Sequence, residues 1–114
     1  LISKSNKIID SEKKLLARLE LYRNELPRKF LMLENCIEKE NKWLVGSDIT
    51  IADIAIWRLM GWVSSGTLDG IPRDILLNYS KICQICLNVD SHPKIQEWVK
   101  KTYPNEYNRG KFVE

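Results

Sequence analysis

The sequence predicts an all-α fold, a helical bundle in which one helix, at about residues 50–63, lies buried at the centre. Apolar residues recur three or four positions apart along most of the chain, which is the spacing of one helix face. One internal segment is apolar on every side, as expected of a helix that is buried on every side. No alternating apolar and polar run and no hairpin turn signal occurs, so we expect no β-sheet.

The composition is that of one ordinary folded domain. The chain has 114 residues and a mass of 13.4 kDa; 44% of its residues are apolar and 29% are charged. These values exclude a disordered, collagen-like or low-complexity chain. No run approaches the roughly 20 apolar residues that a membrane-spanning helix needs. We therefore expect no contact with a membrane.

Charge and cysteine content limit the partners and the compartment. Eighteen basic and 15 acidic residues give a net charge of +3 that is mixed along the chain, which argues against nucleic acid as a partner. Three cysteines are too few, and odd in number, for a disulfide scaffold. We expect a reducing compartment, the cytoplasm.

We divide the chain into three parts. Residues 1–10 are expected to be a linker or the remnant of a preceding helix, residues 11–104 the helical domain, and residues 105–114 a C-terminal tail. Because the chain begins with Leu1 instead of methionine, we expect it to be a segment of a longer protein.

A long one-sided helix is predicted between Ser11, a possible N-cap, and Asn41, a possible stop. Pro27 lies inside it and should kink the helix or divide it in two. The predicted inner face is apolar and consists of Leu15, Leu19, Tyr22, Leu26, Phe30, Leu33 and Ile37. The predicted solvated face is charged and consists of Glu12, Lys13, Arg18, Glu20, Arg23, Arg28 and Glu38.

The predicted central helix at about residues 50–63 has a strong start signal. Thr50 as N-cap and Asp53 three residues later fit a capping box, in which each side chain accepts a hydrogen bond from the backbone N–H of the other residue. Ile49 and Ile54 are spaced as the hydrophobic staple that fixes how the chain enters a helix. We expect this helix start to be buried.

Two more helices complete the predicted bundle. The inner face of the first consists of Ile75, Tyr79, Ile82, Cys86 and Val89. The segment from Asp90 to Pro93 is predicted to break that helix. Pro93 suits the first turn of the next helix, where proline is tolerated. The inner face of the last helix consists of Ile95, Trp98, Val99 and Tyr103.

Several of these segments resemble the C-terminal, all-helical domain of glutathione transferases. The most specific match is the capping motif Thr50-Ile51-Ala52-Asp53. Further matches are Leu26-Pro27, Leu33-Glu34, Trp43-Leu44-Val45-Gly46, Leu68-Asp69-Gly70-Ile71-Pro72, Tyr79 and His92-Pro93-Lys94-Ile95-Gln96-Glu97-Trp98. The resemblance extends from about Leu15 to about Tyr103, and its later segments are similar to the sigma-like members of the mu, pi and sigma branch.

The resemblance implies that binding and catalysis are shared with a second domain outside these 114 residues. In the family, a preceding thioredoxin-like domain binds the cosubstrate glutathione and holds the Tyr or Ser that stabilises its thiolate. The resemblance therefore assigns no catalytic residue to this chain. It assigns the wall of a pocket for a hydrophobic electrophile to Ala55, Ile56, Leu59 and Phe112, with packing in the core as their alternative role. The intact parent would be a homodimeric enzyme, whereas this chain alone would be inactive.

Two other functions remain open. Similar helical domains serve as non-catalytic docking modules in translation proteins, such as the gamma subunit of elongation factor one and extensions of some aminoacyl-tRNA synthetases. A relative that only binds ligands is the third possibility. The segments Leu68–Pro72 and His92–Trp98 favour the enzyme.

Other candidate sites have simpler structural explanations. Cys83 and Cys86 have the CxxC spacing of redox or zinc sites, but they fall in the middle of a predicted helix, and only Cys36 and His92 remain as further ligands. We expect packed thiols and no metal. His92 and Asp53 are expected to cap helices rather than to act in catalysis.

The tryptophans and the basic pairs have structural interpretations as well. Trp43, Trp57 and Trp98 are predicted core residues, and Trp62 is a candidate for the edge of a pocket. The pairs Lys13-Lys14 and Lys100-Lys101 are expected on solvated faces, with an RNA-binding patch as the alternative.

Overall fold

A computed structural model describes residues 11–38, 41–68, 70–103 and 110–113. Its elements are α2 (Ser11–Glu20), the π-helical segment η1 (Leu21–Glu25), α3 (Leu26–Cys36), α4 (Ile51–Val63), α5 (Ser80–Asp90) and α6 (Pro93–Thr102). No strand occurs in these ranges, so the predicted all-α class is confirmed for the described part of the chain. No helix among the described residues is long and apolar enough to span a membrane.

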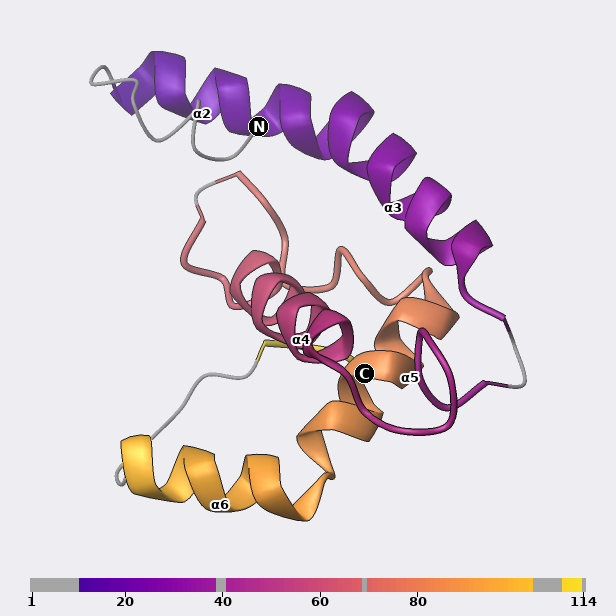
Figure 1. Cartoon of the computed structure of the whole chain (residues 1–114). Coiled ribbons are helices and arrows are strands. Elements are labelled where there is room, and N and C mark those ends of the chain that lie inside the picture. Colours follow the sequence, from indigo (N-terminus) through magenta and orange to yellow (C-terminus); the bar gives the residue numbers. More distant parts are fainter. Residues whose placement is uncertain (1–10, 39–40, 69, 104–109, 114) are drawn as a thin grey trace.

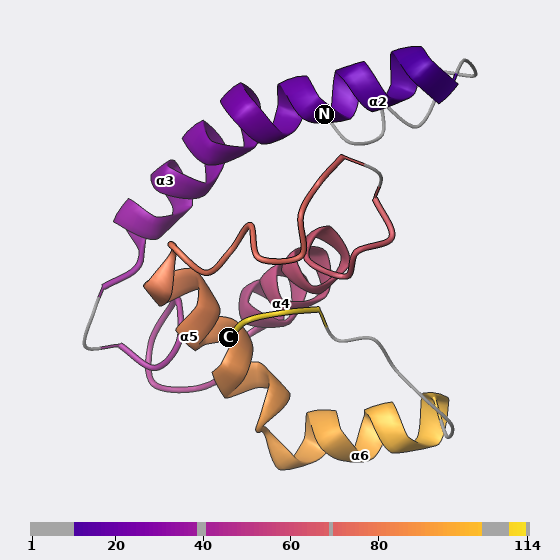
Figure 2. The ribbon, with the colours of Figure 1, turned by 180° about the vertical axis from the view of Figure 1, so that it is seen from behind.

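The first three elements form one long curved rod. In Figures 1 and 2 the rod arches over α4 and α5, the described part of the segment between α4 and α5 runs between the rod and α4, and α6 lies on the opposite side of the molecule. The most extensive helix pairing is between α4 and α5, and α3 also packs against α5. The core therefore lies around α4, α5 and the segment that joins them.

Pro27 bends the predicted helix through a π turn instead of dividing it. Proline lacks a backbone N–H, and its ring would press against the carbonyl of Arg23, four residues earlier. The structure avoids this clash by widening the turn before it, so that Leu26 N–H bonds to the carbonyl of Leu21, five residues back. Pro27 then lies in the first turn of α3, where proline is tolerated.

The π turn also rotates the inner face of the rod. Leu26 and Phe30 are buried as predicted, but the buried residues before them are Leu21, the first residue of η1, and Arg18 on α2. The hydrogen bond from Leu26 to Leu21 spans five residues instead of the four of an α-helix. The inner face of the helix before this turn is therefore displaced by one residue in the sequence. Leu15 is consequently 43% exposed and Arg18 only 2% exposed, so both assignments from the sequence are wrong.

The end of the rod differs from the prediction. Its described part begins at Ser11, so the predicted N-cap at Ser11 borders residues that the structure does not describe. The rod ends at Cys36, because Ile37 adopts an extended conformation, and the predicted stop at Asn41 is five residues too late. Residues 1–10 and most of the 105–114 tail lie outside the described residues.

Helix α4 is not buried on all sides, contrary to the prediction. Its buried residues are Asp53, Trp57, Met60, Gly61 and Val63. The opposite side is exposed, with Ile51 85% and Leu59 47% accessible to solvent. The cause is that α5 packs against one side of α4 and no described element covers the other.

The start of α4 is held by the fully buried carboxylate of Asp53. Thr50 and Asp53 form the capping box. One Asp53 oxygen, Oδ2, accepts hydrogen bonds from the N–H of Thr50 (2.9 Å) and from its hydroxyl (3.0 Å). The other oxygen, Oδ1, accepts the N–H of Leu44 at 2.8 Å. Asp53 therefore joins the loop before the helix to the helix start.

The predicted helix containing Ile75 begins later than expected, at Ser80. Ile75 and Leu76 are buried, but this stretch forms turns rather than an α-helix. The backbone N–H groups of Ile75, Leu77 and Tyr79 each donate to the carbonyl three residues earlier. The first turn of α5 is instead capped from another helix. The Glu34 side chain on α3 accepts the N–H of Ile82 at 2.8 Å and that of Lys81 at 3.2 Å.

Helix α6 is attached to the core chiefly by Val99, which is 4% exposed. Trp43 and Trp57 are buried as predicted, but Trp98 is 45% exposed. Its ring packs edge-on against Tyr103, with centroids 5.9 Å apart, instead of entering the core. The reason is that, among the described helices, α6 packs mainly against α5, so that at most one side chain per turn reaches the core.

Replacing Asp53 with alanine should destabilise the domain strongly. The change leaves the backbone N–H groups of Leu44 and Thr50 without their acceptor, at a cost of about 2–4 kcal/mol. Urea unfolding followed by circular dichroism measures this loss. The exposed Asp48→Ala is the matched control and should change the free energy of unfolding by less than about 0.5 kcal/mol. Equal effects of the two substitutions would contradict the role of Asp53.

Glu34→Gln should also destabilise the domain, by about 1–2 kcal/mol, because a single amide oxygen replaces two charged acceptors at the start of α5. Glu38→Gln is the control, since Glu38 is exposed and its side chain accepts a hydrogen bond from the nearby Asn41 rather than from the start of a helix. Thermal unfolding of the two variants gives the comparison. If Glu38→Gln lowered the melting temperature as much as Glu34→Gln, Glu34 would not be the cap that stabilises α5.

Candidate functional site

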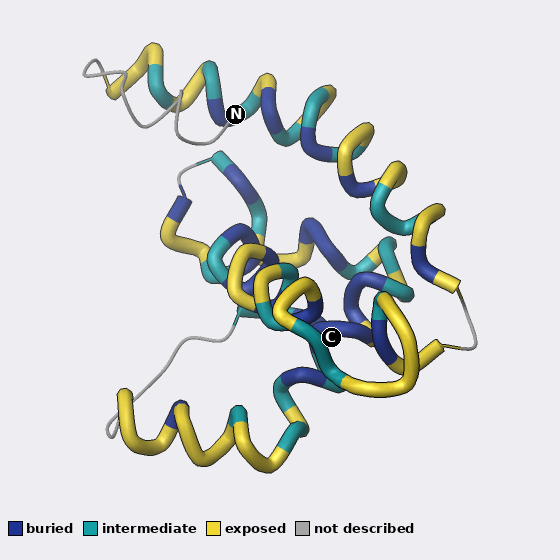
Figure 3. The backbone as a smooth tube through the Cα atoms, in the orientation of Figure 1, coloured by how far each residue is buried: buried dark blue, intermediate teal, exposed yellow. Residues whose placement is uncertain are grey.

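The residues assigned to the electrophile pocket divide into two groups. Ala55 and Leu59 are exposed on α4, one helical turn apart, and Ile56 beside them is half-buried. Together with the exposed Ile51 and Ala52 they form an apolar strip along α4, which we call the α4 strip. Figure 3 shows the exposed side of α4 in yellow. The α4 strip offers an apolar surface to a ligand or to another domain.

Phe112 does not join the α4 strip. It is 6% exposed and packs in the core. The chain before it crosses α4 so closely that a Cβ atom on Gly110, where φ is +85°, would lie 2.6 Å from the carbonyl oxygen of Gly61. The N–H of Lys111 also donates to Ser64 Oγ at 2.9 Å. These contacts hold Phe112 in the core.

The helix-start residues lie where the chain enters α4. Ile49 and Ile54 are half-buried and pack against the core, one on each side of the capping box. Trp62, near the end of α4, is likewise half-buried and packs against the core. These residues support the helix that carries the α4 strip.

The CxxC pair is part of the core of α5. Cys83 and Cys86 are buried, and the Cys83 thiol lies 3.0 Å from the carbonyl of Leu76, to which it donates. Burial, with a smaller contribution from the Glu34 carboxylate, raises the pKa of Cys83 to about 11. Burial also raises the pKa of Cys86 far above its ordinary value. Neither thiol has the lowered pKa that a redox CxxC motif needs.

His92 caps α6. Its Nδ1 accepts the N–H of Lys94 at 3.2 Å, and its ring lies 6.3 Å from that of Trp43. Among the described residues no three His, Cys, Asp or Glu side chains gather as a metal site.

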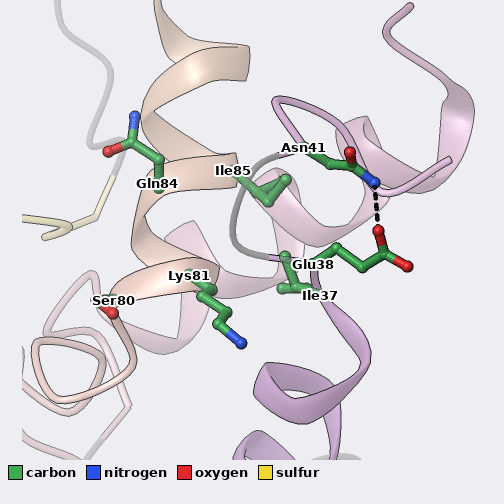
Figure 4. A pocket seen from close by; sticks show the side chains of 7 residues that line it. All are labelled: Ile37, Glu38, Asn41, Ser80, Lys81, Gln84 and Ile85. Atoms are coloured by element: carbon green, nitrogen blue, oxygen red, sulfur yellow. Dashed lines mark hydrogen bonds between the residues drawn. The ribbon is translucent and has the colours of Figure 1, made fainter. Parts of the chain in front are cut away.

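A first hollow, of about 230 Å³, lies between the end of α3 and the start of α5. Figure 4 shows Ile85 on α5 facing Ile37 and Glu38 beyond α3, with Gln84 directed away from them. Its polar side chains are largely paired with their own neighbours: Glu38 accepts from Asn41 at 3.3 Å, and Gln84 donates to Asn88 at 2.9 Å. The hollow therefore has few free groups with which to hold a ligand.

A second hollow, of about 400 Å³, lies between the π turn and the turns before α5. It is lined by Tyr22, Arg23, Pro27, Asp74, Ile75, Asn78 and Tyr79. We call it the π-turn cleft. The sequence analysis missed it, because neither the π turn nor the turns that replace the predicted helix at 75–79 could be seen in the apolar spacing; the proline inside a helical pattern was the only available signal.

Thiol reactivity should separate the three cysteines. Cys36 is exposed and should react with an aromatic disulfide reagent within minutes, whereas only about a thousandth of Cys83 is thiolate near pH 8. The native protein should release about one equivalent rapidly, and Cys36→Ser should remove that fast phase. In strong denaturant all three thiols should react. Three fast equivalents from the folded protein would show that the CxxC pair is accessible.

The family of the chain follows from a comparison with known proteins. Residues 4–102 match the family model described as "Glutathione S-transferase, C-terminal domain". No curated protein and no solved structure matches the chain significantly. The matched range includes every helix from α2 to α6. The chain therefore belongs to the glutathione S-transferase C-terminal domain family.

Proposed function

We propose that this domain forms the electrophile-binding wall of a glutathione transferase whose preceding domain binds and activates glutathione. The observation that carries the proposal is the α4 strip. Ala55 and Leu59 present bare apolar surface on a helix whose other side is fixed in the core. Such a surface binds a hydrophobic electrophile through burial of apolar area, with few hydrogen bonds to orient it.

The chemistry divides between the two domains. The glutathione thiolate attacks an electrophilic carbon and the leaving group departs, so the reaction needs a thiol with a lowered pKa. The pKa values of Cys83 and Cys86 are raised instead of lowered, and both thiols belong to the protein core. The contribution of the α4 strip would be proximity, because it would hold the electrophile beside a thiolate supplied by the other domain.

The finer assignments are part of the same proposal. We place the protein with the sigma-like members because of the Leu68–Pro72 and His92–Trp98 segments, and we expect a homodimer of the intact parent. Three free cysteines, two of them buried, support a reducing compartment, the cytoplasm. The docking module of a translation complex is the competing function.

Steady-state kinetics of the intact parent test the proposed wall. Leu59→Ser should lower kcat/KM for a chloronitrobenzene electrophile about fivefold, as expected from the loss of about 1 kcal/mol of apolar burial. The KM for glutathione should stay unchanged, because the other domain binds it. The control is Leu16→Ser, an exposed leucine on α2, which should leave both values unchanged.

Two results would overturn the proposal. Absence of turnover by the intact parent would favour the docking module. Turnover that Leu59→Ser leaves intact would place the electrophile away from the α4 strip.

A further inference from the structure

The π-turn cleft is lined by polar side chains of both charges that make no hydrogen bond or ion pair with other described residues. No hydrogen bond or ion pair joins the side chains of Tyr22, Arg23, Asp74 or Asn78 to another residue in the described ranges. Arg28, on the same rod but outside the cleft, pairs with Glu25 at 3.1 Å. The cleft therefore holds one free guanidinium and one free carboxylate, which do not pair with each other.

The wall beneath these groups is fixed. The Tyr79 ring packs edge-on against Phe30, with centroids 5.5 Å apart, and its hydroxyl lies 3.5 Å from the carbonyl of Pro27. Ile75 is 8% exposed and supplies an apolar floor. The pKa of Tyr79 is raised by burial and by the Glu34 carboxylate, so the phenol stays protonated at neutral pH.

The π turn supplies the other wall. Tyr22 and Arg23 both lie within η1, whose wider turn shifts their side chains relative to a regular helix. Single π turns inside α-helices frequently mark functional sites. The volume of about 400 Å³ is within the range of roughly 300–1,000 Å³ found for small-molecule sites.

We propose that the π-turn cleft binds a small zwitterion, a free amino acid or a short peptide, between Arg23 and Asp74. The guanidinium of Arg23 suits a carboxylate and the carboxylate of Asp74 suits an ammonium group, while Tyr22 and Tyr79 flank the remainder of the ligand. The site is separate from the α4 strip and does not depend on the proposed transferase role.

Nuclear magnetic resonance titration of the 114-residue chain tests the site with three probes. L-Phenylalanine carries both charges, N-acetyl-L-phenylalanine lacks the ammonium group, and L-phenylalaninamide lacks the carboxylate. At about pH 6 both free amines stay protonated. L-Phenylalanine should shift the signals of Tyr22, Asn78 and Tyr79 saturably, with a dissociation constant of about 1–10 mM. Each singly charged probe should bind at least about fivefold more weakly.

Two charge-removing variants assign each end of the ligand. Arg23→Gln should make L-phenylalanine bind no better than the amide, and Asp74→Asn should make it bind no better than the N-acetyl probe. Arg28→Gln, on the same rod but outside the cleft, is the matched control and should leave all three affinities unchanged. If a variant unfolds, the three probes on the unaltered chain still decide the matter.

The proposal is overturned if no signal saturates, if the three probes bind the unaltered chain equally well, or if the shifted signals lie outside the cleft. Each of these results leaves the α4 strip and its kinetic test untouched.

Discussion

The buried carboxylate of Asp53 is the interaction on which the fold most depends. A charged group with 0% exposure is tolerated only when its oxygens are hydrogen-bonded, and here both are. Because its partners are Thr50 at the helix start and Leu44 in the preceding loop, the same group fixes where α4 begins and how the loop approaches it. Once the start of α4 is fixed, α5 has a surface to pack against. The indole N–H of Trp57 on α4 donates a hydrogen bond to the carboxylate of Asp90 on α5, at 3.2 Å.

A second constraint on the structure is Pro27, which affects the conformation of the long rod beyond its own helical turn. Pro27 needs a wider turn before it, and the resulting π segment rotates the upstream part of α2 relative to α3. That rotation buries Arg18 and exposes Leu15. Tyr22 and Arg23 of the same π segment line the cleft that Asp74 and Asn78 line from the other side. One backbone adjustment therefore links helix packing to a candidate binding site.

The two functional surfaces have different chemistry because their surroundings differ. The α4 strip is apolar and uncovered, so it suits a hydrophobic ligand or a neighbouring domain that contributes the rest of the binding site. The π-turn cleft is polar and carries free charges of both signs, so it suits a ligand that carries both charges itself. The tail behind α4 supports the first surface from within the core, through Phe112 and the contact of Lys111 with Ser64.

The sequence by itself determined the helical class, the capping box at Thr50 and Asp53, the N-cap role of His92 and the family, because these depend on local spacing and on hydrogen bonds between near neighbours. It predicted burial poorly wherever burial depends on which element lies opposite, as for Ile51 on α4 and Trp98 on α6. The cap that Glu34 places on α5 and the bond from Leu44 to Asp53 join residues distant in the chain, so no periodicity could reveal them. Only the tertiary structure decides such contacts, since the free energy of a side chain depends on the groups that the whole fold brings against it.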